Sequence, residues 1–212
     1  MEGEGMAICC IASGARMAAP DLEERAGHVE DLRKYIDLAA DLGCEMVRVF
    51  GGARDRGKEL ITTVDYVADG FVQVLDHAAD RDVLLLLETH DDWCASAPVR
   101  AVVEQVGHPN LKVLWDFMHS QRMLEKPEES FQILGEYTRH THAHDGQIID
   151  GKLQVSGTLG SGLFDHEIPL RLLSEAGYSG YFSVEVIHKP GSEHNADAVL
   201  AQYAEQFQAI MA

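Results

Sequence analysis

Four side chains that can bind a metal ion stand at or near the ends of four apolar segments. VLLLLE ends at Glu88 and LKVLWD at Asp116, while TRHTH ends at His142 and YFSVE at Glu185. Three carboxylates and one imidazole suit Mn²⁺, Mg²⁺ or Co²⁺, and Zn²⁺ or Fe²⁺ are also compatible. Each residue alone has a simpler explanation, as a strand cap or an ion-pair partner. The four together predict one site for a divalent metal ion.

The spacing of these residues indicates how the chain brings them together. The intervals from Glu88 to Asp116 and from Asp116 to His142 each match about one strand–helix unit, and the longer interval to Glu185 leaves room for a β-hairpin at 145–164. Four consecutive strands can direct ligands to one point if their ends converge. A barrel provides this convergence, whereas a flat doubly wound sheet does so poorly.

Apolar runs and amphipathic segments alternate along the chain, which is typical of a parallel α/β fold. We expect one helix to end at Gly43, and the same pattern predicts six strands and five further helices. The expected strands are 7–13, 45–52, 83–88, 111–116, 139–144 and 181–186, and the other expected helices are 62–80, 97–106, 127–137, 166–177 and 195–211. The prediction is a single domain over 1–212 with a TIM-type (β/α) barrel fold of about six parallel strands, which lacks the first two βα units of a complete barrel.

An incomplete barrel leaves open sheet edges, so a homo-oligomer that covers them is expected. The formal charge of −18, from 35 acidic and 17 basic residues, disfavours nucleic acid and anionic membrane surfaces as partners. Four cysteines without CxxC spacing, and an N-terminal segment without a basic region, indicate a cytoplasmic protein with free thiols.

Five further residues are candidates for substrate binding, each with a structural alternative. His119 follows Asp116 and can bend over the barrel mouth, or it can be a histidine satisfied by backbone at a helix start. His144 shares a strand face with His142, although a surface position at a loop start fits equally well. His90 can reach the same pocket or cap the next helix.

The remaining two candidates are arginines. Arg48 lies within an apolar strand, where an inward ion pair with a carboxylate and a contact with substrate are equally plausible. Arg122 lies in a segment that follows a ligand-bearing strand, as does His188, and either side chain can recognise a hydroxyl or a phosphate. The GTLGSG segment lacks the pattern of a nucleotide-binding loop.

An ordered set of short motifs resembles a known family. LETH, WDFMH, HAHD, LGSGLFD and SEAGYSGYFSVE are similar to motifs of the xylose isomerase-like TIM-barrel superfamily, and the resemblance spans about residues 7–207. It implies that Glu88, Asp116, His142 and Glu185 bind one divalent metal, that His119 contacts substrate, and that Glu88 and Glu185 act as acid/base groups. The chain departs from the family pattern at His144, where a lysine is usual, and in the absence of the first two strand–helix units.

The resemblance implies an isomerase or epimerase of a ketose, a sugar phosphate or a related keto-polyol, which works by proton abstraction to an enediolate. One alternative is an inosose-type dehydratase, because it begins with the same abstraction. Another is a degenerate barrel that serves as a metal-binding or subunit module. A DNA-repair AP endonuclease is disfavoured by the charge and by the absence of a D-x-H motif before the glycine-rich stretch.

Overall fold

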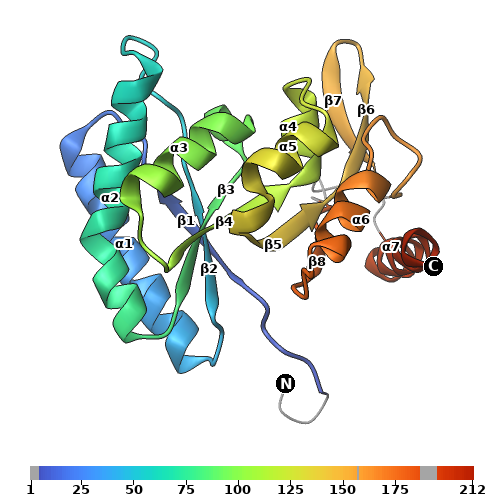
Figure 1. The fold of residues 1–212 in the computed structure, drawn as a ribbon, viewed down its shortest axis with the longest axis horizontal. Helices are drawn as coiled ribbons and strands as arrows, with labels where there is room; N and C mark the ends of the chain where they lie inside the picture. The colour runs from blue at the N-terminus through green and yellow to red at the C-terminus, as the bar shows by residue number, and fades with distance from the viewer. Residues whose placement is uncertain (1–4, 157, 187–194) are drawn as a thin grey trace.

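A curled parallel sheet with helices along its outer side forms the body of the protein (Figure 1). The computed structural model describes residues 5–156, 158–186 and 195–212. The sheet has the strand order β1-β2-β3-β4-β5-β8, and β6 and β7 form a separate antiparallel pair. The strands are β1 (Ile11–Arg16), β2 (Met46–Phe50), β3 (Leu84–Glu88), β4 (Leu111–Asp116), β5 (Thr138–Ala143), β6 (Asp145–Ile149), β7 (Lys152–Ser156) and β8 (Phe182–Val184).

Helices follow most of the strands and pack against one another in chain order. They are α1 (Leu22–Asp41), α2 (Leu60–Asp80), α3 (Ser96–Val106), α4 (Phe117–Arg122), α5 (Pro127–Leu134), α6 (Glu167–Glu175) and α7 (Ala196–Met211). The predicted TIM-type α/β architecture is confirmed as a half-barrel of six parallel strands, and the β6–β7 hairpin precedes the last strand as predicted. Within the described part of the chain, no helix is both long and apolar enough to cross a membrane.

The helix ends follow from local sequence. The Asp21 side chain accepts hydrogen bonds from the first backbone N–H groups of α1, at Glu23 and Glu24. Gly43 has φ +67° directly after the end of α1, a conformation that favours glycine. The buried residues of α2 recur at helical spacing and face the sheet.

Three boundaries differ from the sequence prediction. The first strand spans Ile11–Arg16 and not 7–13, because hydrogen bonding to β2 sets its register. The predicted helix 127–137 ends at Leu134 and continues as a 3₁₀ turn from Gly135, a poor helix former. The short helix α4 was not predicted, and it begins where the Asp116 side chain accepts a hydrogen bond from the backbone N–H of His119.

The sheet register aligns the carboxyl ends of the four ligand-bearing strands. Asp116 pairs with His142, and His142 pairs in turn with Ser183 on β8. The curl also brings the chain before β1 toward β8, since Cys9 Sγ lies 3.9 Å from Ser183 Oγ. The two edge strands of the half-barrel therefore approach each other at this point.

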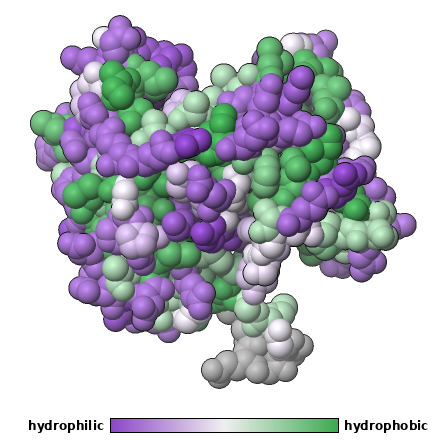
Figure 2. All heavy atoms as spheres, viewed as in Figure 1, coloured by the Kyte–Doolittle hydropathy of each residue, from purple (hydrophilic) through white to green (hydrophobic). Residues whose placement is uncertain are grey.

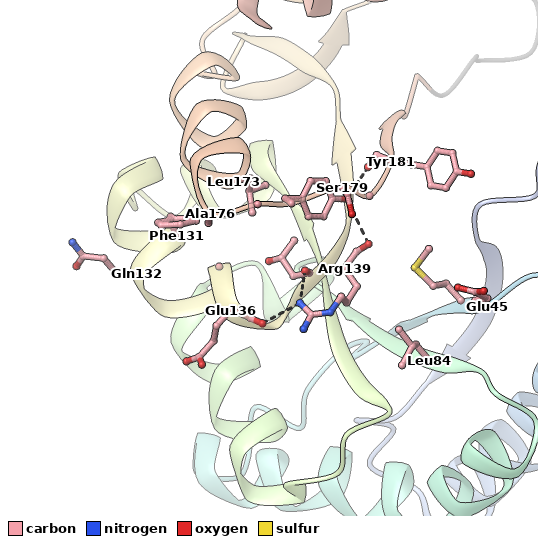
Figure 3. Close-up of a pocket in the computed structure, with 16 residues that line it drawn as sticks. Glu45, Leu84, Phe131, Gln132, Glu136, Arg139, Leu173, Ala176, Ser179 and Tyr181 are labelled. Carbon is pink, nitrogen blue, oxygen red and sulfur yellow. Dashed lines mark hydrogen bonds between the residues drawn. The ribbon is translucent and has the colours of Figure 1, made fainter.

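A cavity of about 850 Å³ lies at the opposite, amino-terminal end of the strands. Figure 3 shows Leu84 at the start of β3, and Arg139 close to Glu136, whose carbonyl oxygen accepts a 3.0 Å hydrogen bond from the arginine. None of the four predicted metal ligands lines this cavity. On the face shown in Figure 2, hydrophobic patches are separated by hydrophilic side chains.

Candidate metal centre

The carboxyl ends of four strands bring the predicted metal ligands together. Glu88 and Asp116 are the last residues of β3 and β4, His142 lies near the end of β5, and Glu185 directly follows β8. The backbone N–H of Glu185 donates to the carbonyl oxygen of Ala143, which continues the pairing of β8 with β5. Each ligand candidate is thus held by the sheet and not by a free loop.

The ligand atoms of Glu88, Asp116, His142 and Glu185 all lie within 4.8 Å of one another. His142 Nδ1 lies at the centre, 2.9 Å from Glu88 Oε1 and 2.9 Å from Glu185 Oε2. Glu88 and Asp116 are almost completely buried, whereas 23% of the Glu185 side chain is exposed. The site is therefore accessible from the side of Glu185.

The ionisation of His142 reflects this concentration of negative charge. Burial alone would lower its pKa, but hydrogen bonds to Glu185 and Glu88 raise the pKa to about 10. Burial would raise the pKa of Glu185, yet the hydrogen bond with His142 lowers it. Without a cation, the positive charge of the His142 imidazolium thus balances the negative charge of the two glutamates.

The donor set fits a divalent cation. Buried carboxylate oxygens of Glu88, Asp116 and Glu185 converge here, and their nearest cationic or titratable neighbours are Arg48, His144 and His142. Buried carboxylates this close together repel one another, and a cation among them would offset the cost. Oxygen and imidazole ligands in this proportion suit hard or borderline divalent metals.

The backbone of Asp116 is fixed by a neighbouring strand end. The Thr89 hydroxyl accepts a 2.8 Å hydrogen bond from the backbone N–H of Asp116 and donates to its carbonyl oxygen at 3.3 Å. Burial would raise the pKa of Asp116, but contact with His144 and the charges of nearby histidines lower it to about 2. The Asp116 side chain therefore remains a carboxylate.

A comparison with protein-family models identifies the family of this chain. The family model described as the xylose isomerase-like TIM barrel matches residues 1–207. The chain belongs to this family. No curated protein sequence matches the chain.

Solved structures with the same fold include an epimerase, a protein with a binding zinc atom and a probable dehydratase. The 3-keto-D-glucoside 4-epimerase YcjR from E. coli has a TM-score of 0.81 at 16% identity, with 98% of this chain and 81% of that chain covered. The IolI protein with a binding zinc atom has a TM-score of 0.83 at 17% identity, and the alignment covers 95% of this chain and 75% of that chain. The probable 3-DHS dehydratase AsbF from Bacillus anthracis has a TM-score of 0.77 at 18% identity, and the alignment covers 97% of this chain and 78% of that chain.

Two histidines of this family member extend the site beside Asp116. His144 Nε2 lies 2.8 Å from Asp116 Oδ2, and His119 Nε2 lies 3.7 Å from the same oxygen. Both histidines are buried, so the structure places His144 inside the barrel and not at a surface loop. Burial lowers the pKa of His119 to about 4; for His144 burial acts in the same direction, but Asp116 raises its pKa above the usual value.

The other candidate residues surround this group. His90 packs against the His119 ring with centroids 4.5 Å apart, and its own Nδ1 contacts Asp91. Arg122 Nη1 donates a 3.0 Å hydrogen bond to His119 Nδ1. Arg48 Nε lies 3.5 Å from Glu88 Oε2, as its ion-pair alternative predicts, and its contact with substrate stays a prediction. His188 lies outside the described residues.

Sequence reasoning missed two buried residues that support the site. His140 Nε2 lies 2.8 Å from Ser183 Oγ, one layer below His142 on the same strand face. The period-two spacing that linked His142 to His144 also includes His140 and could have revealed it. Asp145 accepts hydrogen bonds from the backbone N–H groups of Gly160 and Gly162. It thereby anchors the glycine-rich segment to the start of β6.

Proposed function

We propose that this protein is a divalent-metal-dependent isomerase or epimerase that acts on a ketose, a sugar phosphate or a related keto-polyol. The observation that carries the proposal is the position of two glutamates, each with an oxygen 2.9 Å from His142 Nδ1, beside the carboxylate of Asp116. Family membership and the epimerases among the structural neighbours support a carbohydrate substrate.

Glu88, Asp116, His142 and Glu185 would hold the cation. When bound, it would polarise a substrate carbonyl and acidify the adjacent C–H bond. The zinc atom named for the IolI neighbour supports a bound metal in a protein of this fold, with Mn²⁺, Mg²⁺ or Co²⁺ favoured by three carboxylates and Zn²⁺ or Fe²⁺ compatible.

The two glutamates would move the proton. One of Glu88 and Glu185 removes the proton from the carbon next to the carbonyl, which leaves the substrate as an enediolate. Delivery of the proton to the former carbonyl carbon gives isomerisation. Return to the original carbon restores the substrate from the same side and gives epimerisation from the opposite side. His119, His144, His90, Arg48 and Arg122 are proposed to contact the substrate or to orient groups that do.

Exchange of substrate protons with solvent tests this role directly. The enzyme is loaded with Mn²⁺ and incubated in D₂O with D-fructose, D-tagatose or L-ribulose, and deuterium incorporation is followed by mass spectrometry. Glu88→Gln and Glu185→Gln should each slow incorporation by about 10²-fold or more, because the amide cannot accept the proton. Glu167→Gln, at an exposed position of α6, is the matched control.

Metal content is measured for each variant, since both glutamates are also proposed ligands. A Glu88→Gln or Glu185→Gln variant that retains the metal but exchanges at the wild-type rate would refute the acid/base role of that residue. Absence of exchange with every ketose, in a protein that binds one metal per chain, would favour a metal-binding module and contradict the proposed activity.

A dehydratase is the second candidate, supported by the AsbF neighbour. Dehydration starts with the same proton abstraction and then expels a hydroxyl group instead of returning the proton. A product that is lighter by one water in the same mass spectra distinguishes this outcome.

Location in the cytoplasm is also proposed, supported by four free cysteines and the charge of −18.

A further inference from the structure

Arg122 lies beside one of the two ring nitrogens of His119. The guanidinium Nη1 lies 3.0 Å from His119 Nδ1. A guanidinium has five N–H donors and no acceptor, and it stays protonated in proteins. The Nδ1 atom must therefore accept this hydrogen bond, and neutral His119 must carry its proton on Nε2.

The surroundings of His119 fix the direction of that N–H. The ring packs edge-on against His90 and His144, with centroid distances of 4.5 and 5.2 Å. Its Nε2 is buried and has no hydrogen-bond partner within the described residues. The nearby Asp116 Oδ2 is 3.7 Å away, beyond hydrogen-bond distance. A buried donor thus points toward the metal centre without an acceptor.

We propose that Arg122 is a positioning residue, which holds His119 in the Nε2–H tautomer so that His119 donates a hydrogen bond to a substrate oxygen at the metal centre. The inference rests on the proposed function for the identity of the acceptor. The tautomer itself follows from the contact with Arg122 alone.

The same tautomer bears on how many metal ions the site takes. Ligand atoms of Asp116, His119 and His144 lie within 4.8 Å of one another, so these residues resemble a second metal site beside the first. A ring nitrogen that carries a proton cannot bind a metal. Release of the Nε2 proton to a metal would require Nδ1 to hold a proton against the guanidinium, so Arg122 disfavours His119 as a metal ligand, and we expect one metal ion per chain.

The variants Arg122→Lys, Arg122→Gln and Arg122→Met separate the roles of the guanidinium. Lysine is also a donor only and should preserve the tautomer, whereas glutamine can donate or accept and permits both forms. Methionine removes the polar partner. Arg122 is an exposed residue, so these changes should leave the fold intact, and Arg171→Met on α6 is the matched control.

The tautomer is read by long-range ¹H–¹⁵N correlation spectra of protein with ¹⁵N-labelled histidine, with and without Zn²⁺. A His119→Gln variant assigns the resonance. Wild type and Arg122→Lys should show the Nε2–H form, and Arg122→Met should show a mixture or the Nδ1–H form. The Nδ1–H form in wild type, or an unchanged tautomer in Arg122→Met, would overturn the assignment.

Zinc content and kinetics complete the test. Wild type should bind one Zn²⁺ per chain, and a second Zn²⁺ that shifts the Nε2 signal of His119 would contradict the proposal. With a ketose that undergoes exchange, Arg122→Met should lower kcat/KM about tenfold and Arg122→Lys should largely restore it. Equal kcat/KM in wild type and Arg122→Met, despite a changed tautomer, would refute the donor role. If no ketose reacts, the proposed function fails, while the spectra and zinc content still decide the tautomer.

Discussion

At the residue scale, the candidate metal centre combines carboxylates and a histidine, each of which would be costly to bury in charged form without the others. Glu88 and Asp116 are almost completely buried, and their carboxylate oxygens lie 2.9 Å from His142 and 2.8 Å from His144, respectively. His142 balances them by holding a proton between Glu88 and Glu185. A divalent cation would replace that proton and satisfy several of these oxygens at once.

Asp116→Asn should abolish the stabilisation of the protein by Mn²⁺. The wild type should melt at a higher temperature when Mn²⁺ is added, by an amount equivalent to about 2.7 kcal/mol at a metal concentration near 100 times Kd. The amide of asparagine is a much weaker ligand than a carboxylate, so the variant should show little increase. Differential scanning calorimetry with and without Mn²⁺ measures the difference.

Asp76→Asn provides the control for this variant, because it makes the same change at a fully exposed aspartate of α2. It should retain the wild-type response to Mn²⁺. An Asp116→Asn protein that is stabilised by Mn²⁺ as strongly as the wild type would exclude Asp116 as a ligand.

At the scale of elements, the connection after β2 depends on a close approach of backbone to a buried ring. Gly51 follows β2, and a Cβ atom at this position would overlap the ring of Trp93. Trp93 ends the 3₁₀ turn Asp91–Trp93, which follows His90 at the rim of the site. The packing of this turn therefore links the core to the position of His90.

Gly51→Ala should destabilise the protein by about 1–3 kcal/mol, because the buried Trp93 ring must shift to admit a methyl group. Gly27→Ala is the matched control in the exposed middle of α1, where nothing lies within 4 Å of the added atom. It should stabilise the protein by about 0.5–1 kcal/mol through helix propensity. Urea unfolding measures both changes, and equal effects of the two substitutions would contradict this account of Gly51.

At the scale of the whole molecule, the six-stranded sheet ends at β1 and β8, and neither is followed by a further strand of this sheet among the described residues. Edge strands offer unpaired N–H and C=O groups to other chains. The contact of Cys9 with Ser183 joins the two edges only locally. We propose that a second copy of the chain covers part of this opening.

Self-association should therefore be visible by light scattering coupled to size-exclusion chromatography at micromolar concentration. The charge of −18 opposes association of identical chains, so the dimer fraction should increase from low salt to physiological salt as repulsion is screened. A stable monomer under both conditions would refute this proposal.

The sequence by itself determined the order of the strands and of every helix except α4, together with the candidate ligands at the strand ends. Alternation, burial and cap residues are local properties, so the run of apolar residues before Glu88 could be assigned to a buried strand without knowledge of its neighbours. The same local spacing placed His142 and His144 on one face. It did not define the limits of the first strand, because the register with β2 decides them.

Only the tertiary structure decided which atoms meet. Glu88 and Glu185 lie far apart in the chain, and their contact with one nitrogen of His142 depends on the curl and register of the whole sheet. The pairing of Arg48 with Glu88 likewise depends on side-chain directions that no periodicity specifies. The contact of Arg122 with His119 is local by comparison, since the two residues stand three positions apart in α4. Such long-range contacts are set jointly by all packed elements, whereas sequence patterns report one element at a time.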